Sequence, residues 1–261
     1  MLTLSEVRGA IFDVDDTLLD TFNNRYGRPV DGLHERARLQ AFQEAGIRHN
    51  IPALVSLTPE ENLRGFVEAP VHSLEAAVWH TMYLKGLVTT DEFEPGNPLL
   101  QEVVARKDEI FEKLLRTDGK PFPGAVEFVG WLAENGPGDY FAVASTAIRR
   151  DIDIFLKMSG LDRYFPDKRI ISKDDITHAK PNPEAFNKAF AALSLPEQDR
   201  SQVLAFEDNP RGVMSAKAAG LFTCAITTVH TRQELEALTV APDLIADSFD
   251  EFRTLFEPVQ V

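Results

Sequence analysis

The chain has 261 residues, longer than an average domain and shorter than two, which predicts one core with a large insertion or a small second domain. Apolar residues make up 44% and charged residues 26%, a balance that excludes a disordered or fibrous protein. The formal net charge of −14 argues against nucleic acid or an anionic membrane surface as a partner.

The segment before the first predicted strand carries no basic start and no cleavable apolar stretch, and no run approaches about 18 apolar residues. We therefore expect neither export nor a membrane span. Cys224 is the single cysteine, and its apolar neighbours predict a buried side chain rather than a nucleophile. A single cysteine cannot form a disulfide within the chain, which indicates a reducing compartment, and we therefore expect a cytoplasmic enzyme.

Six short apolar runs bounded by turn residues predict β-strands. In chain order they are Arg8 to Val14, Tyr140 to Ala144, Arg169 to Ile171, Gln202 to Phe206, Phe222 to Thr227 and Asp243 to Ala246. Several of these runs are apolar without alternation, which is typical of parallel strands covered on both faces. Because helical patterns separate the later runs, we predict an α/β protein with a Rossmann-like, doubly wound parallel sheet.

More than a hundred residues separate the first two predicted strands, and their pattern is helical. We expect helices over 34–45, from 59, over 74–85 and from 98. Thr58 and Asn97 have the positions of N-caps, and Gly46 and Gly86 the positions of helix ends. These features predict an inserted α-helical domain over 20–117, with an α/β core formed by 1–19 and 118–261.

A group of acidic residues follows the first predicted strand directly. Because side chains alternate along a strand, Asp13 and Asp15 are expected on the same side at its carboxyl end, where open α/β sheets bind ligands. Like charges so close need a cation or a shared proton. Carboxylate oxygens suit Mg²⁺, and an aspartate beside that ion can attack phosphorus. At this point a simple acidic turn is an equal alternative.

Three further groups are expected at the same edge of the sheet. Glu207 and Asp208 end a second apolar strand, and Asn209 then opens a helix. The second predicted strand ends in Ser145-Thr146, hydroxyls suited to phosphate oxygens, and Lys180 stands just before another predicted helix. Each group alone has an ordinary structural explanation, but together they favour a phosphate site.

The order and types of these residues resemble the motifs of a known protein family. The segments Asp13-x-Asp15-x-Thr17, Ser145, Lys180 and Glu207-Asp208 follow one another in the order of the four motifs of the haloacid dehalogenase (HAD) superfamily. The resemblance covers most of the chain and is closest to the β-phosphoglucomutase-like and phosphoglycolate-phosphatase-like branch. It implies that the inserted helices form a cap domain.

The resemblance also implies roles for the residues that match the motifs. Asp13 would be the nucleophile that forms an aspartyl-phosphate, and Asp15 the general acid and then base. Ser145, with Thr146 beside it, and Lys180 would hold the phosphoryl group.

The metal implied by the family is Mg²⁺. Its ligands would be Asp13, the backbone carbonyl of Asp15 and Asp208, with Glu207 in the outer shell. Thr17 and Asn209 complete the set of expected site residues.

Several departures from the family motifs bear on the reaction. Asp16 stands where the family usually has glycine, although aspartate tolerates unusual backbone angles. Thr17 favours hydrolysis, because mutase relatives often carry valine there, and Pro59 occupies the best match for the cap arginine of the mutases. The presence of Asp15 argues against dehalogenases and phosphonatases.

The sequence thus predicts a Mg²⁺-dependent phosphatase that acts on small phosphomonoesters such as sugar phosphates. A phosphosugar mutase is the alternative, and a phosphometabolite-binding protein without turnover is a weaker one. The segment from Phe22 to Asp31, with Arg25 and Arg28, could add cationic contacts, but a solvated loop is favoured. His34 could match a cap histidine of the mutases, but a surface histidine is favoured.

Overall fold

The computed structural model describes residues 2–21, 31–71 and 73–256. They form two compact units: residues 2–20 and 120–256 make an α/β unit, and residues 31–71 and 73–119, with Thr21, make a helical unit. Within the described residues, no helix combines the length and the apolar character that a bilayer span requires. Apart from Asp31, the arginine-containing segment singled out above lies outside the described residues.

The α/β unit is built on a six-stranded sheet in which all neighbouring strands run parallel. Across the sheet the strands are β5 (Ile170–Ile171), β4 (Phe141–Ala144), β1 (Gly9–Phe12), β6 (Val203–Glu207), β7 (Phe222–Ile226) and β8 (Leu244–Ala246). Each overlaps one of the six predicted runs. The predicted Rossmann-like, doubly wound architecture is therefore confirmed.

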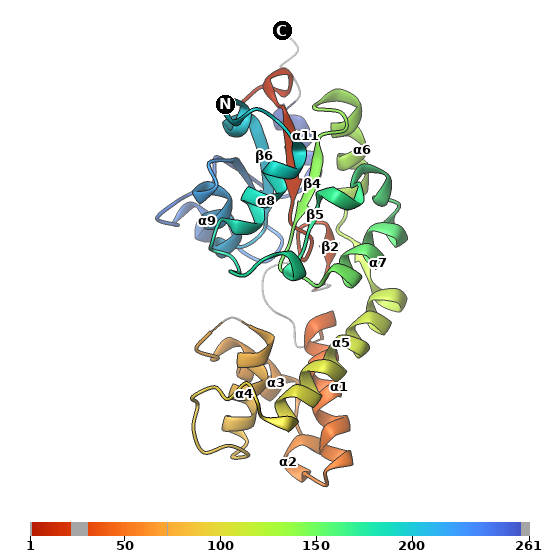
Figure 1. Ribbon diagram of the computed structural model, residues 1–261, viewed down its shortest axis with the longest axis vertical. Helices are drawn as coiled ribbons and strands as arrows, with labels where there is room; N and C mark the ends of the chain where they lie inside the picture. The colour runs from red at the N-terminus through yellow and green to blue at the C-terminus, as the bar shows by residue number, and fades with distance from the viewer. Residues whose placement is uncertain (1, 22–30, 72, 257–261) are drawn as a thin grey trace. The chain divides into compact units, whose positions relative to one another are not determined.

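Helices cover both faces of this sheet. They are α6 (Ala125–Asn135), α7 (Arg149–Ser159), α8 (Glu184–Leu193), α9 (Pro210–Ala218), α10 (Arg232–Glu236) and α11 (Phe249–Phe256). Ile11 of β1 packs with Phe186 of α8 on one face. The next residue, Phe12, stacks on Phe206 with ring centroids 4.6 Å apart, and Phe206 contacts Phe128 of α6 on the other face. Figure 1 shows α6 and α9 on opposite sides of the sheet.

The strand order sets the position of the site. β1 lies in the middle of the sheet, β4 pairs with one of its edges and β6 with the other. Ala10 is in register with Phe141 of β4 and with Leu204 of β6. The carboxyl ends of the three strands therefore lie side by side at the point where the order of connection reverses, which is where open α/β sheets bind ligands.

A second, two-stranded sheet was not predicted. β2 (Leu19–Asp20) and β3 (Lys120–Pro121) pair antiparallel, with Leu19 opposite Pro121. These segments lie immediately before and after the stretch that holds the helical unit. Two residues per strand, one of them proline, give too little pattern for sequence analysis to recognise a strand.

The helical unit contains α1 (Leu33–Arg48), α2 (Pro52–Val55), α3 (Pro59–Val67), α4 (Leu74–Leu84) and α5 (Pro98–Asp118). The expected N-caps are present: the Thr58 hydroxyl accepts from Glu61 N, and Asn97 Oδ1 accepts from Leu99 N and Leu100 N. Gly86 has φ +69° just beyond α4, as expected for a residue that ends a helix.

Two expectations for the helical unit were wrong. Gly46 does not end α1, which continues to Arg48. A Cβ at this position would lie 2.7 Å from Val55 N, so glycine here allows α2 to pack closely on α1. His34 is not a simple surface residue, because its ring is half-buried and stacks on Phe111 of α5 at a centroid distance of 4.2 Å.

Candidate active site

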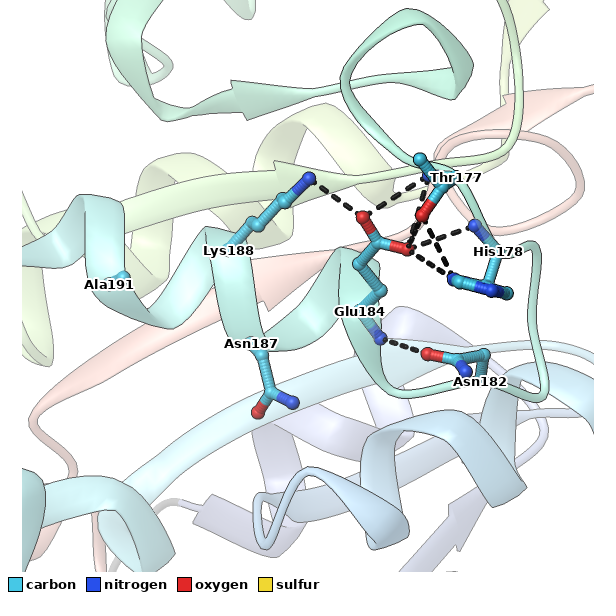
Figure 2. A pocket seen from close by; sticks show the side chains of 7 residues that line it. All are labelled: Thr177, His178, Asn182, Glu184, Asn187, Lys188 and Ala191. Atoms are coloured by element: carbon cyan, nitrogen blue, oxygen red, sulfur yellow. Dashed lines mark hydrogen bonds and ion pairs between the residues drawn. The ribbon is translucent and has the colours of Figure 1, made fainter.

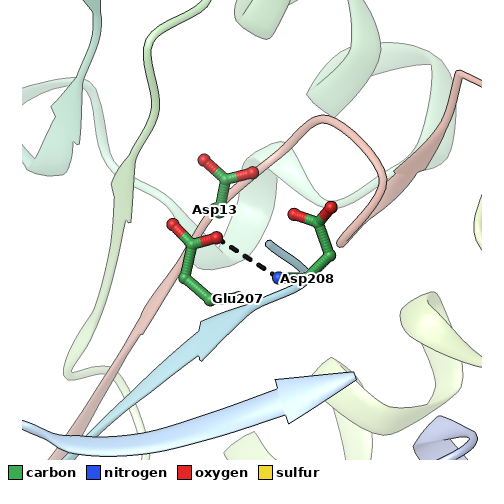
Figure 3. A group of neighbouring side chains, drawn as sticks. All are labelled: Asp13, Glu207 and Asp208. Carbon is green, nitrogen blue, oxygen red and sulfur yellow. Dashed lines mark hydrogen bonds between the residues drawn. The ribbon is translucent and has the colours of Figure 1, made fainter. Parts of the chain in front are cut away.

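Three buried carboxylates meet at the carboxyl ends of β1 and β6. Asp13 follows the last residue of β1, Glu207 is the last residue of β6, and Asp208 comes next. Their exposed fractions are 5%, 0% and 3%, and one oxygen from each lies within 4.8 Å of the others. Figure 3 shows the three side chains converging from the two strand ends. Hard oxygen ligands in such a group are suited to a divalent cation of the Mg²⁺ type.

The Lys180 ammonium lies against the same carboxylates. Its Nζ donates to Asp13 Oδ1 at 2.6 Å, to Glu207 Oε1 at 2.5 Å and to the carbonyl of Ala144, the last residue of β4, at 2.9 Å. Burial by itself would lower the pKa of Lys180, but the charges of Asp13 and Glu207 outweigh it and raise the pKa. Lys180 is therefore positively charged and links all three central strands.

One ammonium does not neutralise three carboxylates. Desolvation by burial raises the pKa of Asp13 well above its usual range, and the charges of Glu207 and Asp208 also raise it, although Lys180 acts in the opposite direction. Desolvation and the neighbouring Glu207 raise the pKa of Asp208 to about 8. The ionised forms of these carboxyl groups are thus disfavoured without a further positive charge, which a bound cation would supply.

The turn after β1 brings Thr17 to the cluster and keeps the Asp15 carboxylate out of it. Asp16 has φ +61°, and its N–H donates to Leu19 O at 2.7 Å, which closes a tight turn. Thr17 Oγ1 donates to Asp208 Oδ1 at 3.3 Å. Asp15 is half-buried in this turn, whereas the acidic cluster consists of Asp13, Glu207 and Asp208.

Asn209 orients both acidic residues that precede it. Its Nδ2 lies 3.2 Å from Asp208 Oδ1 and 3.4 Å from Glu207 Oε2, while its Oδ1 accepts from Gly212 N at 3.0 Å and caps α9. Gly212 was not singled out from the sequence. A Cβ at this position would overlap the Glu207 carboxylate, so glycine lets α9 begin close to Glu207. Gly212 lies five residues after Glu207, which ends a strand, and this spacing could have identified it from the sequence.

The two hydroxyl residues after β4 differ in their surroundings. Ser145 is 1% exposed, its N–H donates to Ile171 O at 3.0 Å, and its Oγ accepts from Ala147 N at 3.1 Å. Thr146 is exposed. The residue before Ser145 is Ala144, whose carbonyl accepts a hydrogen bond from the Lys180 ammonium.

Comparison with known proteins identifies the family. A family model described as a haloacid dehalogenase-like hydrolase matches residues 7–220, which is most of the chain. The protein therefore belongs to the haloacid dehalogenase-like hydrolases, and the resemblance inferred from the sequence motifs is confirmed.

Individual relatives match smaller parts of the chain. Over 78 residues it is 40% identical to validoxylamine A 7'-phosphate phosphatase of Streptomyces hygroscopicus subsp. limoneus, covering 30% of this chain and 34% of that protein. Over 119 residues it is 30% identical to pyrophosphatase PpaX of Anoxybacillus flavithermus, covering 45% of this chain and 52% of that protein. The matches thus span about a third to a half of these curated relatives.

A solved structure matches over nearly the whole chain. A protein from Thermotoga maritima, assigned as a β-phosphoglucomutase, superposes with a TM-score of 0.66 at 20% identity, covering 95% of this chain and 98% of that one. This likeness extends the shared fold beyond the segments that the sequence relatives match.

Proposed function

We propose that the protein is a Mg²⁺-dependent phosphatase that hydrolyses small phosphomonoesters with Asp13 as nucleophile. The observation that carries the proposal is the buried group of Asp13, Glu207 and Asp208 at the strand ends, with Lys180 bound to two of them. Similarity to a validoxylamine A 7'-phosphate phosphatase and to a pyrophosphatase supports phosphoryl transfer to water.

The acidic cluster fits a divalent cation. Asp13 and Asp208 would bind it with the backbone carbonyl of Asp15, and Glu207, which is already hydrogen-bonded to Lys180, would act from the outer shell. When bound, Mg²⁺ neutralises charge on the phosphoryl oxygens during transfer. The raised pKa of Asp208, which shows that its ionised form lacks a sufficient counter-charge, supports this assignment.

The proposed reaction has two steps. The Asp13 carboxylate attacks phosphorus, the bond to the ester oxygen breaks, and Asp15 gives a proton to the leaving alcohol. Asp15 then takes a proton from water, which attacks the aspartyl-phosphate and releases phosphate and free Asp13. Ser145, Thr146 and Lys180 hold the phosphoryl oxygens through both steps, as the family motifs imply.

We assign the helical insertion, with the expected limits 20–117, as a cap that selects the substrate, and 1–19 with 118–261 as the catalytic core. Caps exclude water during the reaction and contact the group that departs. Sugar phosphates and related small metabolites remain the proposed substrate class, in the cytoplasm. Thr17 favours hydrolysis over the mutase alternative.

The test is phosphate release from a panel of sugar phosphates, other phosphorylated metabolites and pyrophosphate, with Mg²⁺ and with EDTA. We expect Mg²⁺-dependent release that falls at least about 1,000-fold in Asp13→Asn. The exposed Asp162 supplies a matched control, and Asp162→Asn should keep wild-type activity. Full activity of Asp13→Asn would contradict the assignment of the nucleophile.

Two other results would redirect the proposal. Conversion of β-glucose 1-phosphate to another phosphosugar without release of phosphate would identify a mutase. Absence of both activities would favour a protein that binds phosphometabolites without turnover.

A further inference from the structure

Lys180 lies in a loop, although its side chain is held at three defined contacts. Residues 176–183 lie between the 3₁₀ turn Lys173–Asp175 and α8 and form neither helix nor strand. A loop of this kind has many conformations in solution, so holding one of them costs conformational entropy that other interactions must offset. The structure shows which side chains supply those interactions.

Glu184, the first residue of α8, binds the start of this loop. Its carboxylate accepts hydrogen bonds from Thr177 N at 3.1 Å, Thr177 Oγ1 at 2.9 Å and His178 N at 2.9 Å. Figure 2 shows these bonds converging on the carboxylate from the loop. Lys188, one helical turn on, donates to Glu184 Oε1 at 2.7 Å and to Asp175 O at 2.5 Å. Its hydrogen bond is the main cause that lowers the pKa of Glu184.

The end of the loop is bound by α9. An Arg211 guanidinium nitrogen donates to the carbonyl of Lys180 itself, and Ser215 Oγ donates to Asn182 O at 2.7 Å. Asn182 Oδ1 in turn accepts from Glu184 N at 3.0 Å. Because α9 begins two residues after Asp208, these bonds link the loop to the acidic turn.

The groove on this surface is explained by the same contacts. It has a volume of about 470 Å³ and is lined by Thr177, His178, Asn182, Glu184 and Lys188, among others. The Glu184 carboxylate, the Lys188 ammonium and the backbone amide of Thr177 in this groove are already bonded to one another. The Glu184 carboxylate therefore holds residues 176–183 in place and is not available to bind a ligand.

We propose that Glu184 is a positioning residue for the reaction: it holds the 176–183 loop so that the Lys180 ammonium stays between Asp13 and Glu207. This inference rests on the proposed function for the part that Lys180 plays in turnover. The loop contacts themselves are independent of it.

The first arm of the test measures the accessibility of Lys180 without any substrate. The folded protein is treated briefly with acetic anhydride, and acetylation of each lysine is quantified by mass spectrometry. In wild type the Lys180 amine is 6% exposed and should react slowly. Glu184→Ala should increase its acetylation rate at least about fivefold, because the loop opens more easily once its hydrogen bonds to the carboxylate are lost.

A matched carboxylate is available as a control. Glu197 also begins a helical segment and pairs with a cation, Arg200, at 2.5 Å, but it does not bind the loop. Glu197→Ala should leave Lys180 labelling at the wild-type rate. Should Glu184→Ala fail to fold, Thr177→Val removes one bond to the carboxylate and should give a smaller increase. Unchanged labelling of Lys180 in the folded Glu184→Ala or Thr177→Val protein would overturn the proposal.

The second arm measures kcat and KM. Glu184→Ala should lower kcat/KM about 10- to 100-fold, the size expected for a displaced catalytic group, and Glu184→Gln, which keeps an acceptor oxygen, should lie between it and wild type. In a Lys180→Met background, Glu184→Ala should change kcat/KM less than about twofold, because the group it positions is gone. Wild-type kcat/KM in Glu184→Ala, or full additivity with Lys180→Met, would overturn the positioning role.

The two arms separate failure of this inference from failure of the proposed function. If wild type hydrolyses no phosphate ester, the proposed function is wrong. The labelling of Lys180 alone then decides whether Glu184 positions it.

Discussion

Asp208 shows how the surroundings of one carboxyl group decide when it carries charge. It is buried beside Glu207, and the two effects together raise its pKa to about 8. Thr17 Oγ1 and Asn209 Nδ2 donate to its Oδ1, but these bonds do not offset the loss of water. A carboxyl group of this kind destabilises the folded state when it ionises without a counter-ion.

The sign of the resulting pH dependence follows from proton binding. Between pH 3.8, the ordinary pKa of an aspartate, and about 8, the folded protein holds the Asp208 proton and the unfolded chain does not. The free energy of unfolding of the metal-free protein should therefore fall across this window as pH rises. Asp208→Asn lacks this contribution, so at pH 8 in EDTA it should be more stable than wild type by at least about 1 kcal/mol.

Urea unfolding of both proteins at pH 5 and pH 8 measures this difference. The stability gained by Asp208→Asn should grow from pH 5 to pH 8, and added Mg²⁺ should stabilise wild type more than the variant. If the free energies of unfolding of wild type and Asp208→Asn differ by the same amount at pH 5 and at pH 8, Asp208 is already ionised at pH 5 and its pKa is not raised.

Gly212 matters because it has no side chain where α9 begins beside Glu207. A methyl group at this position would overlap the Glu207 carboxylate, so Gly212→Ala must displace Glu207 or shift the start of α9. We expect a loss of about 1–3 kcal/mol in the free energy of unfolding, the usual cost of overpacking a buried site. Urea unfolding measures it.

Gly96 provides the comparison, because a Cβ there meets no atom within 4 Å. Gly96→Ala should leave the free energy of unfolding within about 0.5 kcal/mol of wild type. Equal effects of the two substitutions would contradict the close contact between Gly212 and Glu207.

At the scale of elements, the sequence was most informative where a segment has a strong pattern. The six apolar runs became the six strands, because a strand buried on both faces needs apolar residues throughout. Asp16, which stands where the family usually has glycine, was expected to tolerate an unusual backbone angle. It has a φ of +61°, which aspartate adopts more readily than most residues. The β2–β3 pair could not be predicted, because its pairing depends on the rest of the fold.

The start of α5 allows a quantitative test at this scale. Asn97 Oδ1 accepts hydrogen bonds from Leu99 N and Leu100 N, two of the amides that a helix leaves without partners. Asn97→Ala should lower the free energy of unfolding by about 1 kcal/mol.

Loss of helix circular dichroism in urea reports this change. The exposed Lys113 on the same helix is the control, and Lys113→Ala should have an effect below about 0.5 kcal/mol. If Asn97→Ala unfolds at the wild-type urea concentration, the cap does not stabilise α5.

At the scale of the whole molecule, the site depends on contacts between distant parts of the sequence. The Lys180–Asp13 pair joins residues 167 positions apart, and the Thr17–Asp208 bond joins residues 191 apart. The sequence predicted that these residues share one sheet edge, since parallel strands align their carboxyl ends. It could not predict that Lys180 bonds to both Asp13 and Glu207, or that Arg211 binds the Lys180 carbonyl, because those contacts depend on loop conformations.

The proposal that Asp13 forms a covalent phosphoryl intermediate is tested most directly by trapping it. The protein, incubated with its best substrate and Mg²⁺, is quenched in acid and reduced with borohydride, which converts an aspartyl-phosphate to homoserine. We predict that mass spectrometry of the digested protein finds homoserine at position 13 and unmodified aspartate at position 15. Rapid turnover with homoserine at neither position, or at position 15 alone, would contradict the account.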